Sequence, residues 1–165
     1  MGRIGQAVAR RAQGFGMRIL SVPRRKDQPP PSESARQPIS LQTLLETSDF
    51  VSLHVPLTTD TRHLIGTKEL GLMKPSAFLV NTSRGPVVDE SALVSALQAG
   101  QPAGAGLDVY EREPAIHPGL IDNSRVVLLP HLGSATTTTR IRMGMMCVEN
   151  VTAVLKGQPA RNRVV

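Results

Sequence analysis

Short apolar runs alternate along the chain with longer stretches of helical periodicity. Apolar residues recur at helical spacing in five segments, each of which predicts a helix. These segments are 2–13, 41–46, 67–73, 89–99 and 135–156. Strand-sized apolar runs lie at 18–22, 50–55, 77–82, 105–109 and 126–129. Continuously apolar strands that alternate with helices are typical of a parallel sheet covered on both faces. The pattern therefore predicts a doubly wound parallel α/β fold, a Rossmann-type arrangement.

The composition favours one aliphatic globular domain in a reducing compartment. The chain has 165 residues with three Phe, one Tyr and no Trp. Its single cysteine, Cys147, can form neither an internal disulfide nor a cysteine-based zinc site. We expect Cys147 to lie on the last helix with its side chain buried in the protein core. No apolar run approaches the roughly 18 residues that span a membrane. We therefore expect a soluble, cytoplasmic protein with no metal, membrane or nucleic-acid partner.

Positive charge leaves two alternatives open. The formal net charge is +6, and the first acidic residue, Asp27, follows a stretch that contains several arginines. Such a start resembles a mitochondrial transit peptide, which would change the location. Charge alone would also fit a basic nucleic-acid binder, although so few aromatic rings argue against binding by base stacking.

A glycine pattern at the N-terminus predicts a dinucleotide site. Gly2 and Gly5 fit the second and third glycines of G-x-G-x-x-G, whose first glycine and preceding strand would lie before residue 1. In the usual continuation, an acidic residue after the second strand binds the ribose hydroxyls. Here the run at 18–22 leads instead into Arg24 and Arg25, within a proline-rich loop over 23–38. Guanidinium groups bind a 2′-phosphate well, so the sequence favours NADP(H) over NAD(H), unless this is only a solvated basic loop.

Three polar motifs follow strands, where open α/β sheets build their sites. They are NTSRGP at 81–86, GLDVYEREP at 106–114 and LPHLGS at 129–134. In this order and spacing they resemble the D-isomer-specific 2-hydroxyacid dehydrogenase family, and within it most closely the glyoxylate/hydroxypyruvate reductases. The resemblance extends over essentially the whole chain. It implies an oxidoreductase that transfers a hydride between NADP(H), or NAD(H), and a small 2-oxo or 2-hydroxy acid, acting as a homodimer in the complete protein.

The resemblance also implies roles for particular residues. Arg84 would bind the substrate carboxylate, His131 would be the acid/base, and Glu113 would be the carboxylate partner of that histidine. Glu111 competes for the last role, but only Glu113 precedes a proline as the family pattern requires. A nearby carboxylate favours the protonated form of a histidine, which suits a proton donor. The implied cofactor contacts are Gly2, Arg3, Ile4 and Gly5 for the pyrophosphate, Arg24 and Arg25 for the 2′-phosphate, Pro56 over the adenosine, and Thr82, Asp108 and Gly133 for the nicotinamide half.

The chain departs from the family in what it lacks. Family members carry a substrate domain whose larger part precedes the nucleotide domain, and neither that part nor the first strand is present. We therefore expect residues 1–165 to be a partial NAD(P)-binding domain, with about 157–165 belonging to the substrate domain. The runs at 18–22 and 77–82 should border the absent strand, which predicts a chain that is aggregation-prone or only loosely folded and binds NADPH weakly if at all. Because the substrate domain normally closes over such a site, we also expect the chain to be inactive alone. A non-catalytic, dinucleotide-sensing module, like the corepressors that resemble this family, is the alternative function.

Overall fold

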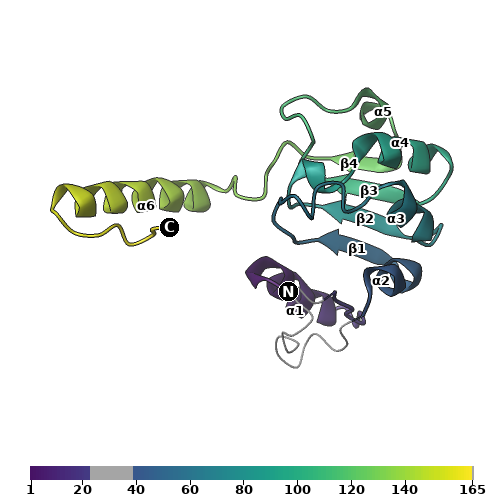
Figure 1. Cartoon of the computed structure of the whole chain (residues 1–165), viewed down its shortest axis with the longest axis horizontal. Helices are drawn as coiled ribbons and strands as arrows, with labels where there is room; N and C mark the ends of the chain where they lie inside the picture. The colour runs from purple at the N-terminus through teal and green to yellow at the C-terminus, as the bar shows by residue number, and fades with distance from the viewer. Residues whose placement is uncertain (23–38, 165) are drawn as a thin grey trace. The chain divides into compact units, whose positions relative to one another are not determined.

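The structure is a computed structural model that describes residues 1–22 and 39–164. Residues 1–130 form one compact unit and residues 131–165 form another. The first unit holds the sheet and most of the helices, whereas the second consists of one long helix and a C-terminal tail (Figure 1).

The first unit is built on a parallel sheet of four strands in the order β1-β2-β3-β4. The strands are β1 (Phe50–Leu53), β2 (Phe78–Asn81), β3 (Gly104–Leu107) and β4 (Val126–Leu128). Leu53 pairs with Asn81, Asn81 with Leu107, and Leu107 with Leu128, so the carboxyl ends of all four strands meet at one edge. The predicted parallel α/β fold is confirmed, and the loops expected to carry the site leave from this edge.

Most helices begin where the sequence predicts, because polar side chains cap them. Ser40 accepts a hydrogen bond from the backbone of Thr43, and Asp89 accepts one from Ala92. The helices of the first unit are α1 (Arg3–Gln13), α2 (Leu41–Thr47), α3 (Thr67–Leu72), α4 (Glu90–Gln98) and α5 (Pro118–Ile121), with a 3₁₀ turn η1 (Gly85–Val87). Helix α3 packs between α2 and α4. The short α5 and η1 are elements that periodicity did not predict, since each is one turn long.

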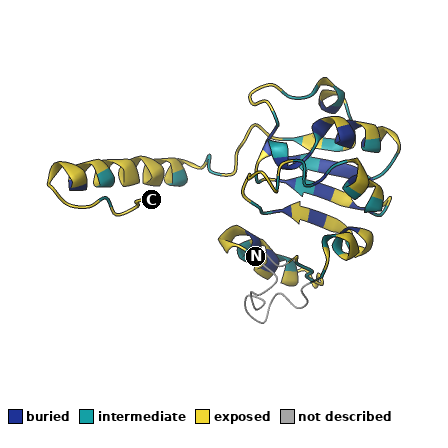
Figure 2. Ribbon diagram, in the orientation of Figure 1, coloured by how far each residue is buried: buried dark blue, intermediate teal, exposed yellow. Residues whose placement is uncertain are grey.

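The core lies on one face of the sheet, because buried and more exposed residues alternate along β1 and β2. Figure 2 shows that the buried residues lie mostly on the strands and helices of the first unit. Val51, Leu53 and Leu79 point into it from the strands and are buried with Leu93 of α4. On the other face Phe50 and Phe78 stack with ring centroids 5.6 Å apart, yet they remain 56% and 43% exposed. The continuous apolar runs predicted burial of both faces, whereas the described residues bury one face much more fully than the other.

Two predictions about the edge of the sheet are wrong. Residues 18–22 form no strand, and only Ser21 makes an isolated bridge there. A run of this kind needs a neighbouring strand, and among the described residues none precedes α1. The run at 77–82 is also not an edge, because β2 pairs with β1 on one side and β3 on the other. Among the described residues the two edge strands are β1 and β4.

The second unit contains α6 (Thr137–Leu155), which is capped by the hydroxyl of Thr136. Ala153 is its one buried residue, and Cys147 is exposed. The predicted core position of Cys147 is therefore wrong, because the described residues of this unit supply no other helix or strand to cover α6. The tail is held to the helix by Asn162, whose backbone and side chain pair with the amide of Asn150 at 3.0 Å. No helix in the described part of the chain is long and apolar enough to cross a membrane.

Candidate active site

The loop after β2 is shaped by a buried amide. Asn81 ends the strand, and its Oδ1 accepts hydrogen bonds from the backbone and hydroxyl of Ser83 at 3.0 and 2.9 Å. Its Nδ2 donates to the carbonyl of Arg84 at 3.0 Å. Arg84 and Thr82 are both exposed. Asn81 was not among the predicted site residues, although a polar residue ending a buried strand could have indicated it.

Gly85 joins this loop to the one after β3. A Cβ atom at Gly85 would overlap the backbone carbonyl of Tyr110 and would lie 2.5 Å from the nitrogen of Glu111. No side chain can occupy that space, so glycine is required here to let the two backbones touch. The loop that presents Arg84 therefore rests directly on the segment that leads to Glu113.

Tyr110 fixes the segment after β3 through both its backbone and its side chain. Its amide donates to Glu113 Oε1 at 3.0 Å, which orients that exposed carboxylate. Its hydroxyl lies 2.8 Å from the carbonyl of Leu129 and 3.2 Å from that of Leu107. Burial is the main cause that raises the pKa of the Tyr110 hydroxyl. Asp108 is buried at the end of β3, and its amide donates to the carbonyl of Asn81 at 3.0 Å.

The glycine turn at the start of α1 leaves the first backbone amides of the helix without a side-chain cap. Gly2 begins the helix without a side-chain cap, and a Cβ placed there would meet nothing within 4 Å. Gly5 is buried, and its Cβ would lie 2.7 Å from the Met1 side chain and 3.5 Å from His54. Open backbone amides at a helix N-terminus suit an anion. These residues fit a dinucleotide, with Arg3 and Ile4 exposed beside the turn.

A sequence profile described as the D-isomer specific 2-hydroxyacid dehydrogenase, NAD binding domain, matches residues 1–133. The chain belongs to this family. Among its relatives, the glyoxylate reductase of Thermococcus litoralis is 51% identical over 163 residues, which cover 99% of this chain and 49% of that protein. The chain therefore spans about half the length of the curated relatives it matches.

Solved structures agree with this assignment. The TT0316 protein of Thermus thermophilus superimposes with a TM-score of 0.92 at 48% identity, over 100% of this chain and 51% of that one. An NADPH-dependent glyoxylate/hydroxypyruvate reductase of Sinorhizobium meliloti superimposes with a TM-score of 0.87 at 38% identity, over 96% and 49% of the two chains. The Rossmann-type fold of the 2-hydroxyacid dehydrogenases is thus shared by this chain.

The predicted site residues of this 2-hydroxyacid dehydrogenase domain fall into three groups. Arg84 and Glu113 lie on loops that touch within the first unit. His131 and Gly133 are exposed in the second unit, so the pairing of His131 with Glu113 stays a prediction. Arg24 and Arg25 lie outside the described residues, and their 2′-phosphate role also stays a prediction. Pro56 is exposed just after β1, and its carbonyl accepts from the hydroxyl of Thr61 at 2.6 Å.

His131 has an unusual backbone conformation. Its φ is +57°, in the left-handed region that few residues other than glycine adopt. Such conformations cluster at functional sites, where the surrounding structure stabilises them. The chain enters this residue from Leu129, whose amide donates to the carbonyl of Leu107 at 2.9 Å.

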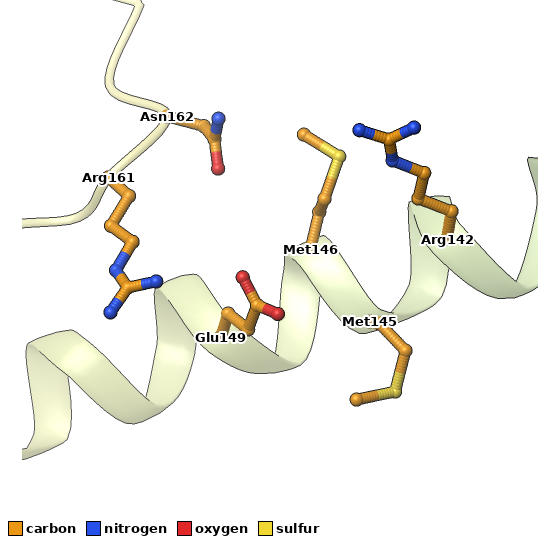
Figure 3. Close-up of a pocket in the computed structure, with 6 residues that line it drawn as sticks. All are labelled: Arg142, Met145, Met146, Glu149, Arg161 and Asn162. Carbon is orange, nitrogen blue, oxygen red and sulfur yellow. The ribbon is translucent and has the colours of Figure 1, made fainter.

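The second unit of this domain also has a cavity of about 330 Å³ that contains none of the predicted site residues (Figure 3). Figure 3 shows Arg161 and Asn162 of the tail turned toward Glu149 and Met146 of α6. The cavity is lined by Arg142, Met145, Met146, Glu149, Arg161 and Asn162. Within the described residues, no group of three or more His, Cys, Asp or Glu side chains could hold a metal ion.

Proposed function

We propose that the full gene product containing this chain reduces a small 2-oxo acid, such as glyoxylate or hydroxypyruvate, with NADP(H) as the reductant. The contact of Gly85 with the Tyr110–Glu111 backbone carries this proposal, because it joins the Arg84 loop to the Glu113 loop at the carboxyl edge of the sheet. The names of the glyoxylate reductase and the NADPH-dependent reductase among the relatives support the substrate class.

The chemistry divides among three side chains. A two-point hydrogen bond from the Arg84 guanidinium would hold the substrate carboxylate. His131 would donate a proton to the substrate carbonyl oxygen during reduction and accept it back during oxidation. Glu113 would orient the imidazole and favour its charged form. The bound nicotinamide supplies the hydride. Gly2 and Gly5 would hold its pyrophosphate at the start of α1, which leaves the reacting carbon to be positioned by the strand ends.

The test of this function measures NADPH oxidation by the full gene product with glyoxylate, hydroxypyruvate and other small 2-oxo acids. Arg84→Gln should raise the KM for the 2-oxo acid and lower kcat/KM by about 100-fold, because a charged two-point contact is lost. His131→Asn should lower kcat by about 10²- to 10⁴-fold. The matched control Arg10→Gln changes an exposed arginine of α1 and should leave both constants unchanged. Absence of turnover with every 2-oxo acid would show that the proposed function is wrong.

Cofactor preference is a finer proposal, supported by the absence of an acidic residue where the family pattern places one. We propose that Arg24 and Arg25 bind the 2′-phosphate of NADP(H). In the full gene product, Arg24→Asp with Arg25→Ala should weaken NADPH binding by about 30- to 100-fold and NADH binding much less, because two charged contacts are lost. An equal loss for both nucleotides would mean that the arginines only stabilise their loop.

Three further proposals rest on the family resemblance. We expect the full gene product to be a homodimer, which light scattering in solution would measure. We expect it in the cytoplasm, and fractionation of cells would show a mitochondrial location instead if the basic N-terminal stretch were a transit peptide.

Residues 1–165 alone should not catalyse the reduction, since closure of a substrate domain normally excludes water from such a site. Turnover by residues 1–165 at the rate of the full gene product would contradict the last proposal.

A further inference from the structure

Two glutamates outside the predicted site exchange hydrogen bonds with each other's backbone. The carboxylate of Glu111 accepts a hydrogen bond from the amide of Glu90 at 2.9 Å. The carboxylate of Glu90 in turn accepts one from the amide of Glu111 at 2.7 Å. The two residues are 21 positions apart in sequence, so this reciprocal pair closes a ring between the start of α4 and the loop after β3.

Helix capping alone does not account for this pair. The N-terminus of α4 already has a cap, because Asp89 Oδ1 accepts from the amide of Ala92 at 2.9 Å. In α3, by contrast, the third helical residue Glu69 reaches back to the amide of Gly66 at 3.3 Å, which is an ordinary local arrangement. At α4 the carboxylate that accepts from the amide of Glu90, the first helical residue, comes from a distant loop. The Glu90–Glu111 pair therefore serves the junction between two segments rather than the helix.

Placing two carboxylates together in a partly buried position is unfavourable in itself. Glu90 is buried, and burial is the main cause that raises its pKa, while the charge of Glu111 acts in the same direction. Hydrogen bonding to the Glu111 backbone and the charges of His117 and Arg112 oppose this rise. Nε2 of His63 also lies 3.3 Å from Glu111 Oε1. Two apolar side chains would fill the same space with a smaller desolvation penalty, but they could not accept hydrogen bonds from the two backbone amides.

The pair lies next to both loops of the candidate active site. Glu111 follows Tyr110, the residue whose backbone contacts Gly85 and whose amide orients Glu113. Glu90 begins the helix that follows η1, the turn that starts at Gly85 directly after Arg84. A change in either hydrogen bond would shift the Tyr110–Glu113 segment relative to the Arg84 loop. Displacements of about 1 Å at a reacting centre can cost about 100-fold in rate.

We propose that Glu90 and Glu111 are positioning residues, whose reciprocal hydrogen bonds hold the Glu113 carboxylate in place relative to Arg84. This inference rests on the proposed function. Neither glutamate is among the predicted substrate or cofactor contacts; both act through the segment that carries Glu113. The pair thus accounts for two acidic residues that the reductase chemistry does not use.

The kinetic test uses the full gene product with glyoxylate and NADPH. Glu90→Ala and Glu111→Ala should each lower kcat/KM for glyoxylate by about 10- to 100-fold, with the KM for NADPH changed less than about twofold. Glu90→Gln and Glu111→Gln should recover activity to within about threefold of the wild type, because an amide oxygen still accepts the hydrogen bond. Glu69→Ala, which removes a carboxylate–amide bond at α3, is the matched control and should leave kcat/KM unchanged.

Hydrogen exchange gives a second measurement that does not require turnover. The amide of Tyr110 donates to Glu113 Oε1, so its exchange rate reports on that carboxylate directly. It should rise about tenfold or more in the alanine variants and stay unchanged in Glu69→Ala. If the wild-type protein reduces no 2-oxo acid, the proposed function is wrong, while this measurement still decides whether the pair holds Glu113.

Several results would overturn the positioning role. These are alanine variants with wild-type kcat/KM, unchanged exchange at Tyr110, or glutamine variants as impaired as the alanine variants. Should an alanine variant fail to fold, Glu111→Asp carries the same test, because it keeps the charge but shortens the side chain by one methylene. Its kcat/KM should then fall while Glu111→Gln stays near the wild type.

Discussion

The two units of this chain differ in how they are stabilised. Residues 1–130 bury their own core: Ile65, Leu79 and Leu93 are fully inaccessible to solvent. Residues 131–165 contain a helix of 19 residues whose apolar side chains, such as Ile141 and Leu155, remain exposed. Helices of this kind gain most of their stability from packing against other elements. The first unit can therefore hold Arg84 and Glu113 in place by itself, whereas the unit that begins with His131 has little core of its own.

This difference predicts that truncating buried and exposed leucines has unequal effects. Leu79→Ala removes a side chain from the centre of the sheet and should lower the free energy of unfolding by about 2–5 kcal/mol. Leu155 is 82% exposed, so Leu155→Ala should change this free energy by less than about 0.5 kcal/mol. Urea unfolding of residues 1–165, at concentrations that keep the chain monomeric, measures both. Equal effects would mean that residues 131–165 share the core of the first unit.

A second prediction concerns the contact between loops in the first unit. Gly85→Ala places a Cβ against the backbone of Tyr110, which must shift, so the variant should lose about 1–3 kcal/mol of stability. Gly106→Ala is the matched control in β3, where the nearest atom would be a Val80 methyl at 4.0 Å. The same urea experiment compares them. If Gly85→Ala unfolds at the urea concentration of Gly106→Ala, the two loops do not rest on each other as described.

Much of the first unit could be predicted because its signals are local. Ser40 and Asp89 are capping residues followed by apolar periodicity, and both start helices where expected. The strands at β1 to β4 are short apolar runs bounded by loop residues. The run at 18–22 is also short and mostly apolar but forms no strand, because strand formation depends on a neighbouring strand as well as on the run itself. Its misassignment, like that of 77–82 as an edge, came from non-local pairing that a sequence pattern does not contain.

The candidate site likewise contains residues that the sequence identifies and residues that only the structure identifies. Arg84, Glu113 and His131 could be named because they lie in motifs after strands. Asn81, Tyr110 and the Glu90–Glu111 pair were missed, because their roles consist of hydrogen bonds to backbone groups up to 21 residues away. A motif shows which side chains carry chemistry. The residues that hold them in position become visible only when distant segments are brought together.

A substitution in the exposed helix of the second unit should stabilise that helix, by less than the substitutions above destabilise the first unit. Gly144 lies inside α6, and a Cβ there would meet nothing within 4 Å. Glycine is less favourable than alanine in a helix interior by up to about 1 kcal/mol. Gly144→Ala should therefore raise the helix content of a peptide of residues 131–165, measured by circular dichroism. Unchanged helix content would show that the tail held by Asn162, rather than helix propensity, determines the conformation of this unit.

The smallest predicted effect is a pH dependence that belongs to the first unit alone. His54 follows β1, with Nε2 3.0 Å from the hydroxyl of Ser52, and burial lowers its pKa from the ordinary value of 6.5. A histidine with a lowered pKa binds its proton less tightly in the folded chain than in the unfolded chain. Its contribution to stability is therefore lost as the pH falls below about 6.5 toward the folded-state pKa.

His54→Asn removes this titration while keeping a side chain that can bond to Ser52. Between about pH 7.5 and about pH 5.5, roughly one unit on either side of the ordinary histidine pKa, the wild type should lose stability relative to His54→Asn. The measurement is the difference in the urea midpoint between the two proteins at each pH. His117→Asn, which replaces a second histidine of the same unit, is the control substitution. A midpoint difference that does not change with pH would show that His54 stays as accessible to water in the folded unit as in the unfolded chain.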